Sequence, residues 1–297
     1  MILRRLSIIL SSAVAVAACS PHNSNFTAPI DVEMCESLTE AQGIINGDIV
    51  TKSTQITNST VLVVQVNSKD EQSVCTGTLI DENKVLTAAH CAPPDTSVIY
   101  IAFTKNSQCI GADPINTLRV VDKALVHPDY DFTSKSLNNA SNDIAVMKFS
   151  GPKALGYAIE ELPQKDLKVS NTDNLTMLGY GDTLENARDA GTLRMTSASA
   201  SRLQKSFHVA LTKTDFEIPK TLALLQDQNG VCGGDSGGPL YVNNPEGKPR
   251  LVGITSMGVD HRTTSYNKAR VCHGISLFTD LRPHLEWIQL QMLHLAK

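Results

Sequence analysis

The chain has 297 residues, 41% hydrophobic and 19% charged, with a formal net charge of −4. This length can bury one large core or two smaller ones, and the slight negative charge excludes an electrostatic case for nucleic-acid binding. The sequence shows no repeat at solenoid or propeller periods and no apolar stretch long enough for a membrane-spanning helix.

The N-terminus has the pattern of an export signal. Two arginines precede a short apolar run over residues 6–18, which is too short to span a bilayer. The run ends in Val16-Ala17-Ala18-Cys19, which is similar to a bacterial lipoprotein processing box. We predict a signal peptide over 1–18, cleavage before Cys19 and lipidation of its thiol. Ordinary cleavage after Ala17, with Cys19 incidental, is the alternative.

The seven cysteines bear on the same question. An odd thiol in an exported protein needs an explanation, and lipid on Cys19 leaves six cysteines that can pair in an oxidising compartment. Residues 19–43 are polar and predict a spacer and pro-segment. We expect an exported protein, either secreted or lipid-anchored at the bacterial envelope (periplasm, outer membrane or cell surface). For a eukaryotic source, four triplets would fit the glycosylation pattern, at Asn25, Asn58, Asn139 and Asn174.

From residue 44 onward, short apolar runs rich in Val, Ile, Leu and Thr alternate with Gly, Pro, Asn and Asp. This pattern predicts an all-β sandwich or barrel. Only residues 281–295 have helical spacing, with one apolar stripe of Leu285, Ile288, Met292 and Leu295.

Three motifs contain the side chains of an acyl-transfer triad. In chain order they are Leu86-Thr87-Ala88-Ala89-His90-Cys91, Asn142-Asp143-Ile144-Ala145-Val146-Met147 and Cys232-Gly233-Gly234-Asp235-Ser236-Gly237-Gly238-Pro239. Ser236 needs a base to remove its proton, and a histidine such as His90 has a pKa near the working pH. Asp143 can fix the tautomer of the imidazole and stabilise the imidazolium.

Each motif alone has a simpler interpretation. Asp143 could be a turn residue, and His90 beside Cys91 could be a core histidine or half of a metal site. No Cys-x-x-Cys pattern or second close histidine supports a metal. The order His, Asp, Ser favours the triad, because that order is one of the few known arrangements of these residues. The seven other histidines are interpreted as structural or surface residues.

With further stretches, these motifs make the chain resemble the trypsin/chymotrypsin-like serine proteases. The further stretches are Ile44-Ile45-Asn46-Gly47-Asp48, Cys75-Thr76-Gly77-Thr78-Leu79-Ile80, Val126-His127-Pro128-Asp129-Tyr130, Gly179-Tyr180-Gly181 and Leu251-Val252-Gly253-Ile254-Thr255-Ser256-Met257-Gly258. The resemblance implies a serine endopeptidase that acts on protein or peptide substrates through an acyl-enzyme, with no metal or organic cofactor. We expect a monomer.

The resemblance also implies the architecture of a peptidase domain over 44–297. It implies two six-stranded antiparallel β-barrels, over about 44–155 and about 165–280, with the active cleft between them. A C-terminal helix over about 281–296 follows.

Other residues near the triad receive roles from the resemblance. The N–H groups of Gly234 and Ser236 would form the oxyanion hole, in an unusual turn that glycine permits. Ser256 would hydrogen-bond Asp143 from the other side.

The resemblance further implies activation by cleavage. An unknown activating protease would remove the pro-segment, and the new α-amine of Ile44 would pair with Asp235. Most family zymogens have Arg or Lys before this bond, but this chain has Gly43, so a trypsin-like activator is not expected. Asp235 could instead be a loop residue that accepts hydrogen bonds from local N–H groups.

Substrate preference follows from the family's pocket positions, which match Gly230, Gly258 and Gly274. A pocket base without a charge cannot compensate for the desolvation of a Lys or Arg head. We therefore predict a preference for apolar or aromatic side chains before the scissile bond. Asp227 is the alternative, because it could fold into the pocket base and select basic residues.

The family's disulfides match Cys75 with Cys91 and Cys232 with Cys272, and the remaining Cys35 and Cys109 would pair with each other. That last bridge would keep a lipidated pro-segment attached after cleavage before Ile44. Two rival functions remain: a catalytically inactive relative that acts as a binding module, and a membrane-anchored adhesion or scaffold protein. The intact His90, Asp143 and Ser236 motifs argue against both.

Overall fold

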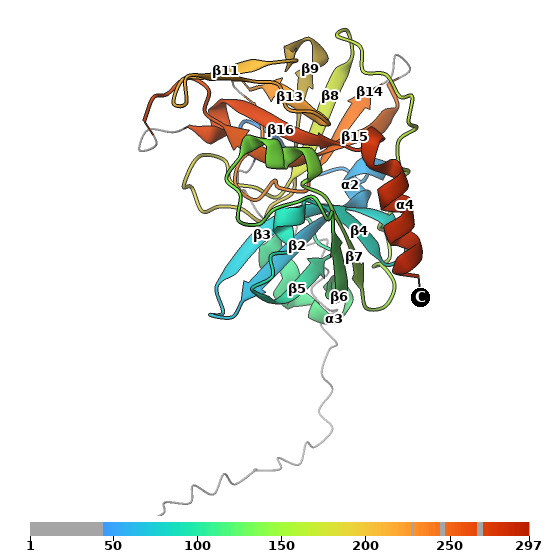
Figure 1. The fold of residues 1–297 in the computed structure, drawn as a ribbon. Coiled ribbons are helices and arrows are strands. Elements are labelled where there is room, and N and C mark those ends of the chain that lie inside the picture. Colours follow the sequence, from blue (N-terminus) through green and yellow to red (C-terminus); the bar gives the residue numbers. More distant parts are fainter. Residues whose placement is uncertain (1–43, 227–228, 244–246, 266–269, 297) are drawn as a thin grey trace, which may run out of the picture.

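The computed structural model describes residues 44–226, 229–243, 247–265 and 270–296 (Figure 1). The predicted signal peptide and spacer therefore lie outside the described residues. So do Cys19, Asn25, Cys35 and Asp227, and nothing in the structure bears on the expectations made for them.

The first half of the chain forms a closed antiparallel barrel in the order β2-β3-β4-β7-β6-β5. Its strands are β2 (Thr60–Asn67), β3 (Gln72–Asp81), β4 (Lys84–Thr87), β5 (Thr96–Ala102), β6 (Leu118–Val126) and β7 (Ala145–Phe149). Alternate residues of a strand point to opposite faces. On β2, Val61 and Val63 therefore pack in one buried cluster, while Leu62 packs in another.

The second half forms an eight-stranded antiparallel sheet in the order β1-β9-β8-β14-β15-β16-β13-β10. Six longer strands make its centre, namely β8 (Asn174–Gly179), β9 (Arg194–Ser199), β13 (Thr221–Leu225), β14 (Pro239–Asn243), β15 (Pro249–Val259) and β16 (Ile275–Asp280). Two-residue strands, β1 (Asp48–Ile49) and β10 (Leu203–Gln204), lie at its edges. A separate hairpin consists of β11 (Phe207–Val209) and β12 (Thr214–Phe216).

The predicted all-β fold with a C-terminal helix is confirmed, with two differences. Among the described strands no pairing joins β1 to β10, so hydrogen bonds do not close the second sheet into a six-stranded barrel. Residues 48–49, assigned to the first barrel, pair with β9 instead. They do so because the chain leaving the tight turn at Ile44 runs along β9 and occupies the backbone groups of its open edge.

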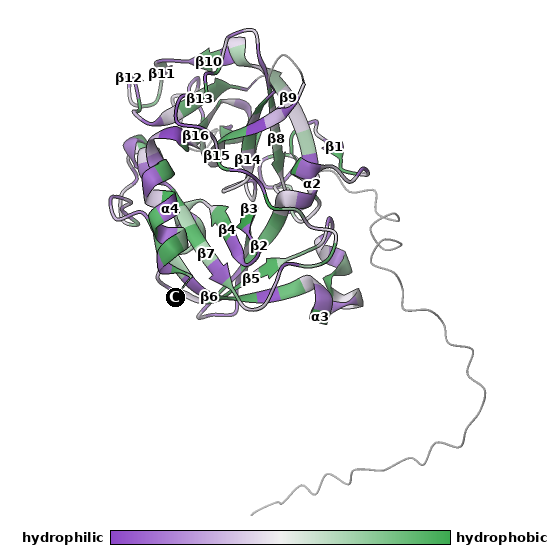
Figure 2. Cartoon of the chain, turned by 90° about the vertical axis from the view of Figure 1, so that its right-hand side faces the viewer, coloured by the Kyte–Doolittle hydropathy of each residue, from purple (hydrophilic) through white to green (hydrophobic). Residues whose placement is uncertain are grey.

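Three α-helices are described: α2 (Gln55–Ser59), α3 (Pro114–Thr117) and α4 (Leu285–His294). Helix α4 is shorter than the predicted 281–296, because residues Arg282–His284 form a 3₁₀ turn. Ile288 and Leu295 are buried, and α4 contacts β7 of the first barrel (Figure 1). Figure 2 shows hydrophilic and hydrophobic bands alternating along α4. No helix in the described ranges is long and apolar enough to cross a membrane.

The largest core cluster joins the two halves. Leu62, Leu86 and Val146 from the first barrel share it with Tyr241 and Ile254 from the second sheet. This packing places the loops at the ends of β4 and β7 opposite the loop that precedes β14. The predicted triad residues lie in or beside these three loops.

Candidate active site

The histidine and aspartate of the predicted triad are in direct contact. His90 lies in the 3₁₀ turn Ala89–Cys91 after β4, and Asp143 lies just before β7. Asp143 is fully buried, and its Oδ2 lies 2.8 Å from His90 Nδ1. Its Oδ1 accepts a hydrogen bond from the His90 backbone N–H at 3.0 Å. Ser256 Oγ donates to Asp143 Oδ2 at 2.6 Å. The imidazole is thus held through Nδ1, which leaves Nε2 for proton transfer.

The environment makes His90 a stronger base. Burial lowers the pKa of His90, but the negative charge of Asp143 and the hydrogen bond to it together outweigh burial, so the pKa is raised above its usual value. A third of the side-chain surface of His90 is exposed, whereas that of Asp143 is not exposed at all. The imidazole of His90 is therefore accessible from the solvent, while Asp143 is shielded from water.

Ser236 is brought to the same cavity as His90. The cavity has a volume of about 310 Å³ and includes both residues in its lining. The loop is held across the two halves, because Thr76 N–H donates to Ser236 O at 2.8 Å and Thr76 Oγ1 donates to Gly234 O at 3.0 Å. Ser236 Oγ makes no hydrogen bond with His90 within the described residues. Catalytic hydrogen bonds are often long until substrate binds.

At the predicted oxyanion hole, Gly234 has a backbone conformation that favours glycine. Gly234 has a φ of +94°, and a Cβ there would lie 2.9 Å from the Cα of Gly181. Only glycine fits this position without strain. Neither Gly234 N–H nor Ser236 N–H donates a hydrogen bond to another described residue. Two N–H donors at and beside Ser236 are therefore available to an incoming oxygen.

Asp235 is fully buried between these two residues. Its Oδ1 accepts from Gly181 N–H at 2.7 Å and its Oδ2 from Cys232 N–H at 2.8 Å. Burial raises the pKa of Asp235 to about 7, although both N–H groups act to lower it. Ile44 is 1% exposed, but no hydrogen bond joins it to Asp235 in this structure, where residue 44 is not a chain terminus. The structure thus buries both members of the predicted activation pair without joining them.

The cavity beside Ser236 contains one of the three predicted specificity residues. Gly258 lines it, together with the apolar side chains of Val231, Met257 and Val271. Gly230 and Gly274 do not line it. No carboxylate contributes to the cavity wall in the described part of the chain.

Gln226 explains the position of Gly230. The amide of Gln226 fills the space where a side chain at Gly230 would start. Its Nε2 donates to Val231 O at 2.8 Å, so this buried amide supports the cavity wall from behind. Its backbone N–H also donates to Gly274 O at 2.8 Å. No motif in the sequence identifies Gln226, because its role depends on which backbone it meets in the fold.

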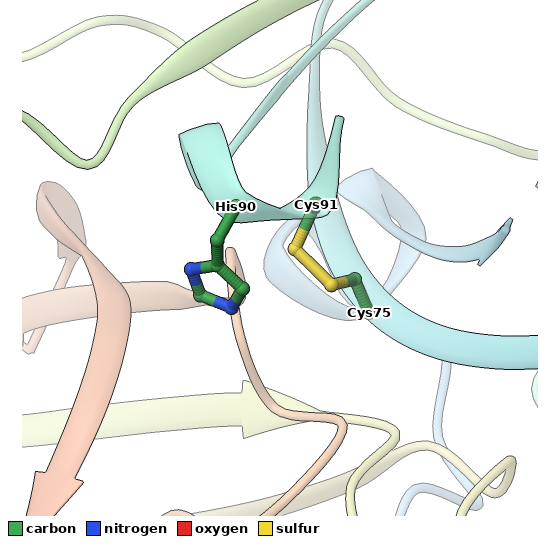
Figure 3. A group of neighbouring side chains, drawn as sticks. All are labelled: Cys75, His90 and Cys91. Carbon is green, nitrogen blue, oxygen red and sulfur yellow. A yellow bond between two sulfur atoms is a disulfide. The ribbon is translucent and has the colours of Figure 1, made fainter. Parts of the chain in front are cut away.

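Two of the predicted disulfides are present, Cys75–Cys91 beside His90 and Cys232–Cys272 at the cavity. Cys109 is buried and disulfide-bonded, while its predicted partner lies outside the described residues. The His90 ring lies beside the first disulfide (Figure 3). Potential donor atoms of Cys75, His90 and Cys91 lie within 4.8 Å of one another, but the two sulfurs are bonded to each other and are not thiolate ligands.

Comparisons with known proteins agree with this geometry. The family model for trypsin matches residues 49–287. Ovochymase-2 of Mus musculus is 28% identical over 75% of this chain, which spans only 38% of that protein. A trypsin of Saccharopolyspora erythraea is 29% identical over 66% of this chain and 80% of its own length.

Solved structures show the same fold. HL collagenase has a TM-score of 0.61 at 19% identity, covering 84% of this chain and 98% of its own. The protein GrC has a TM-score of 0.63 at 21% identity, covering 84% of this chain and all of its own. The family match spans most of the chain, and the chain therefore belongs to the trypsin family of serine endopeptidases.

Proposed function

We propose that this protein hydrolyses peptide bonds through His90, Asp143 and Ser236. The observation that supports this most strongly is the hydrogen-bonded pair of His90 and Asp143 at the edge of the cavity that also contains Ser236. The available N–H groups of Gly234 and Ser236 add a site for the developing oxyanion.

The reaction is a double displacement. Ser236 Oγ attacks the carbonyl carbon of the substrate while His90 Nε2 takes the hydroxyl proton. The oxyanion is held by the Gly234 and Ser236 N–H groups, and the intermediate collapses when His90 protonates the leaving amine. Water then attacks the acyl-enzyme, His90 takes its proton, and Ser236 leaves with that proton restored. Asp143 stabilises the imidazolium in both halves of the reaction.

The proposed preference is for an apolar or aromatic side chain before the scissile bond. The cavity is large enough for one such side chain, and Val231, Met257 and Val271 give it an apolar lining. Since no described carboxylate lies in its wall, a Lys or Arg head would be desolvated there without a counter-charge.

The protein is also proposed to be made as a zymogen. Removal of the pro-segment would expose the amine of Ile44, and Asp235 is the buried carboxylate that could receive it. Export fits the two disulfides, which form in oxidising compartments. Lipid on Cys19 and a Cys35–Cys109 bridge would tether the active enzyme to a membrane. Non-reducing electrophoresis of cleaved protein tests the tether, because release of the pro-segment without reductant would exclude it.

Paired chromogenic peptides test the activity. Protein cleaved before Ile44 should hydrolyse peptides that have Phe or Leu directly before the scissile bond, and Ser236→Ala should abolish this hydrolysis. Hydrolysis after Arg would support the peptidase activity but contradict the predicted apolar preference, and it would indicate that Asp227 forms the pocket base. Absence of Ser236-dependent hydrolysis of every peptide, with the Ile44 terminus verified, would instead support a binding module.

A further inference from the structure

Arg194 is among the largest side chains that are fully buried in the described structure. It is the first residue of β9, and its Nη1 donates to Thr192 O at 3.2 Å. Its Nε and Nη2 have no hydrogen-bond partner within the described residues. A buried guanidinium with unused donors is costly unless a negative charge lies near it. The position of the nearest negative charge therefore indicates the role of Arg194.

The register of the sheet places Arg194 beside Asp235. Arg194 is paired with Gly179 between β9 and β8. Paired residues of antiparallel strands project to the same face, with Cβ positions about 4.5–5.5 Å apart. The space above Gly179, where its side chain would start, is filled by the carboxylate of Asp235. The Arg194 side chain therefore starts one paired position away from this carboxylate. Its charge acts on Asp235 electrostatically, and the two side chains form no direct ion pair.

The negative charges around this point outnumber the positive ones. Burial and the nearby Asp182 together raise the pKa of Asp235 to about 7, and Arg194 is the one described cation that lowers it. Burial lowers the pKa of Arg194 to about 10, while Asp189 and Asp235 oppose that decrease. Arg194 thus stays charged near neutral pH and interacts with two acidic groups from different segments.

Both segments belong to the wall of the oxyanion hole. Asp182 N–H donates to Gly233 O at 2.6 Å, and Asp182 Oδ1 accepts from the N–H groups of Asp189 and Ala190. Ala190 lies against Gly234, since a Cβ on that glycine would be 3.4 Å from the Ala190 Cβ. A cation that attracts Asp235 and Asp189 together therefore holds this loop against the segment before Ser236.

We propose that Arg194 is a positioning residue that neutralises Asp235 in the uncleaved chain and so keeps the oxyanion hole formed before any Ile44 amine exists. This rests on the proposed peptidase function and extends it. Cleavage supplies a second cation to a carboxylate that already has one. The uncleaved chain consequently has peptidase activity of its own, and Arg194 determines how much.

The test compares the intact full chain with the same chain cut at an engineered site immediately before Ile44. For each form, kcat is measured on a Phe peptide together with the rate at which a serine-directed phosphonate labels Ser236. Intact wild type should have a kcat within about tenfold of the cut form. Intact Arg194→Met should lose about 100-fold or more, as when an oxyanion donor is lost. Cut Arg194→Met should recover to within about tenfold of cut wild type, because the Ile44 amine replaces the missing cation.

Two further variants separate charge from general damage. Arg194→Lys keeps the cation and should retain most of the intact-chain activity. Arg202→Met removes another arginine with an unpaired buried nitrogen, in the turn after β9, and should change neither form. The ratio of cut to intact kcat is the decisive readout, because a general folding defect lowers both forms equally.

Several outcomes would overturn the proposal. One is intact Arg194→Met that is as active as intact wild type, and another is intact wild type that is inactive while the cut form is active. If Arg194→Met does not fold in either form, Arg194→Lys is the deciding variant. Intact Arg194→Lys that unfolds at the wild-type temperature but is as inactive as Ser236→Ala would then contradict the proposal. Absence of Ser236-dependent hydrolysis by cut wild type would refute the peptidase function itself, and this proposal with it.

Discussion

Each half of the molecule buries one carboxylate in a loop of the candidate site, and the two carboxylates differ in their hydrogen-bond partners. Asp143, at the end of the first barrel, accepts three hydrogen bonds, two from His90 and one from Ser256. Asp235, in the second half, accepts two from backbone N–H groups and has a pKa raised to about 7. The first carboxylate is fixed by its own side-chain partners. We expect the second to depend on a separate positive charge, and we therefore propose that a cation controls the conformation of its loop.

The largest expected effect comes from removing the negative charge of the first carboxylate. Asp143→Asn should lower kcat about 10⁴-fold, because the amide can hold the imidazole in the wrong tautomer and cannot stabilise the imidazolium. Asp129→Asn, which changes an exposed carboxylate near His127, is the matched control and should leave kcat unchanged.

The same variant has a predicted effect on pH dependence. The neutral form of His90 is the base, so kcat/KM should rise with pH through the raised pKa of His90 in the wild type. Asp143→Asn removes the two causes that raise this pKa and leaves burial, which lowers it. The acidic limb of the profile should therefore move to lower pH. A limb that stays in place or moves to higher pH would show that Asp143 does not set the pKa of His90.

The second effect concerns the backbone of the oxyanion hole. Gly234→Ala puts a Cβ at a φ of +94° and 2.9 Å from the Cα of Gly181, so the loop must shift. Losing one oxyanion donor costs about 10²–10³ in kcat, and we expect a loss in this range. Gly111→Ala is the control, because a Cβ there meets no atom within 4 Å. Wild-type kcat in Gly234→Ala would exclude Gly234 N–H from the oxyanion hole.

The third effect tests whether the partners of Asp143 act individually. Ser256→Ala removes the hydroxyl that donates to Asp143 Oδ2 at 2.6 Å. A hydrogen bond to a charged group is worth about 1.5–3 kcal/mol, so kcat should fall about 10- to 100-fold. Ser276→Ala removes an equally buried hydroxyl that has no described hydrogen-bond partner, and it should have little effect. Equal kcat values for the two variants would show that the Ser256 bond does not support catalysis.

Features that depend on a short local motif could be predicted from the sequence, whereas features that depend on contacts between distant segments could not. The triad positions could be identified because each lies in a short local motif, and the β pattern and the apolar stripe of α4 are also local. The proposed role of Arg194 could not be predicted, because it depends on cross-strand pairing with Gly179 and on Asp235 beyond it. The position of Gln226 could not be predicted for a similar reason, since its amide donates to the backbone carbonyl of Val231. The pairing of residues 48–49 with β9 likewise depends on an open sheet edge that only the fold creates.

The smallest effect concerns the contact that joins the two halves. Buried Thr76 Oγ1 donates to Gly234 O at 3.0 Å and accepts from Tyr180 N–H at 3.0 Å. Thr76→Val leaves both backbone groups without this partner, so the free energy of unfolding should fall by about 1.5 kcal/mol in urea titrations. Thr78→Val is a matched control on the same strand, because Thr78 Oγ1 is buried with no hydrogen-bond partner among the described residues. Removing an unpaired buried hydroxyl should leave stability unchanged or raise it. If Thr78→Val lost as much stability as Thr76→Val, the cost would come from the loss of a hydroxyl on β3 in general. The Thr76 bonds would then not be what fastens the oxyanion loop to the first barrel.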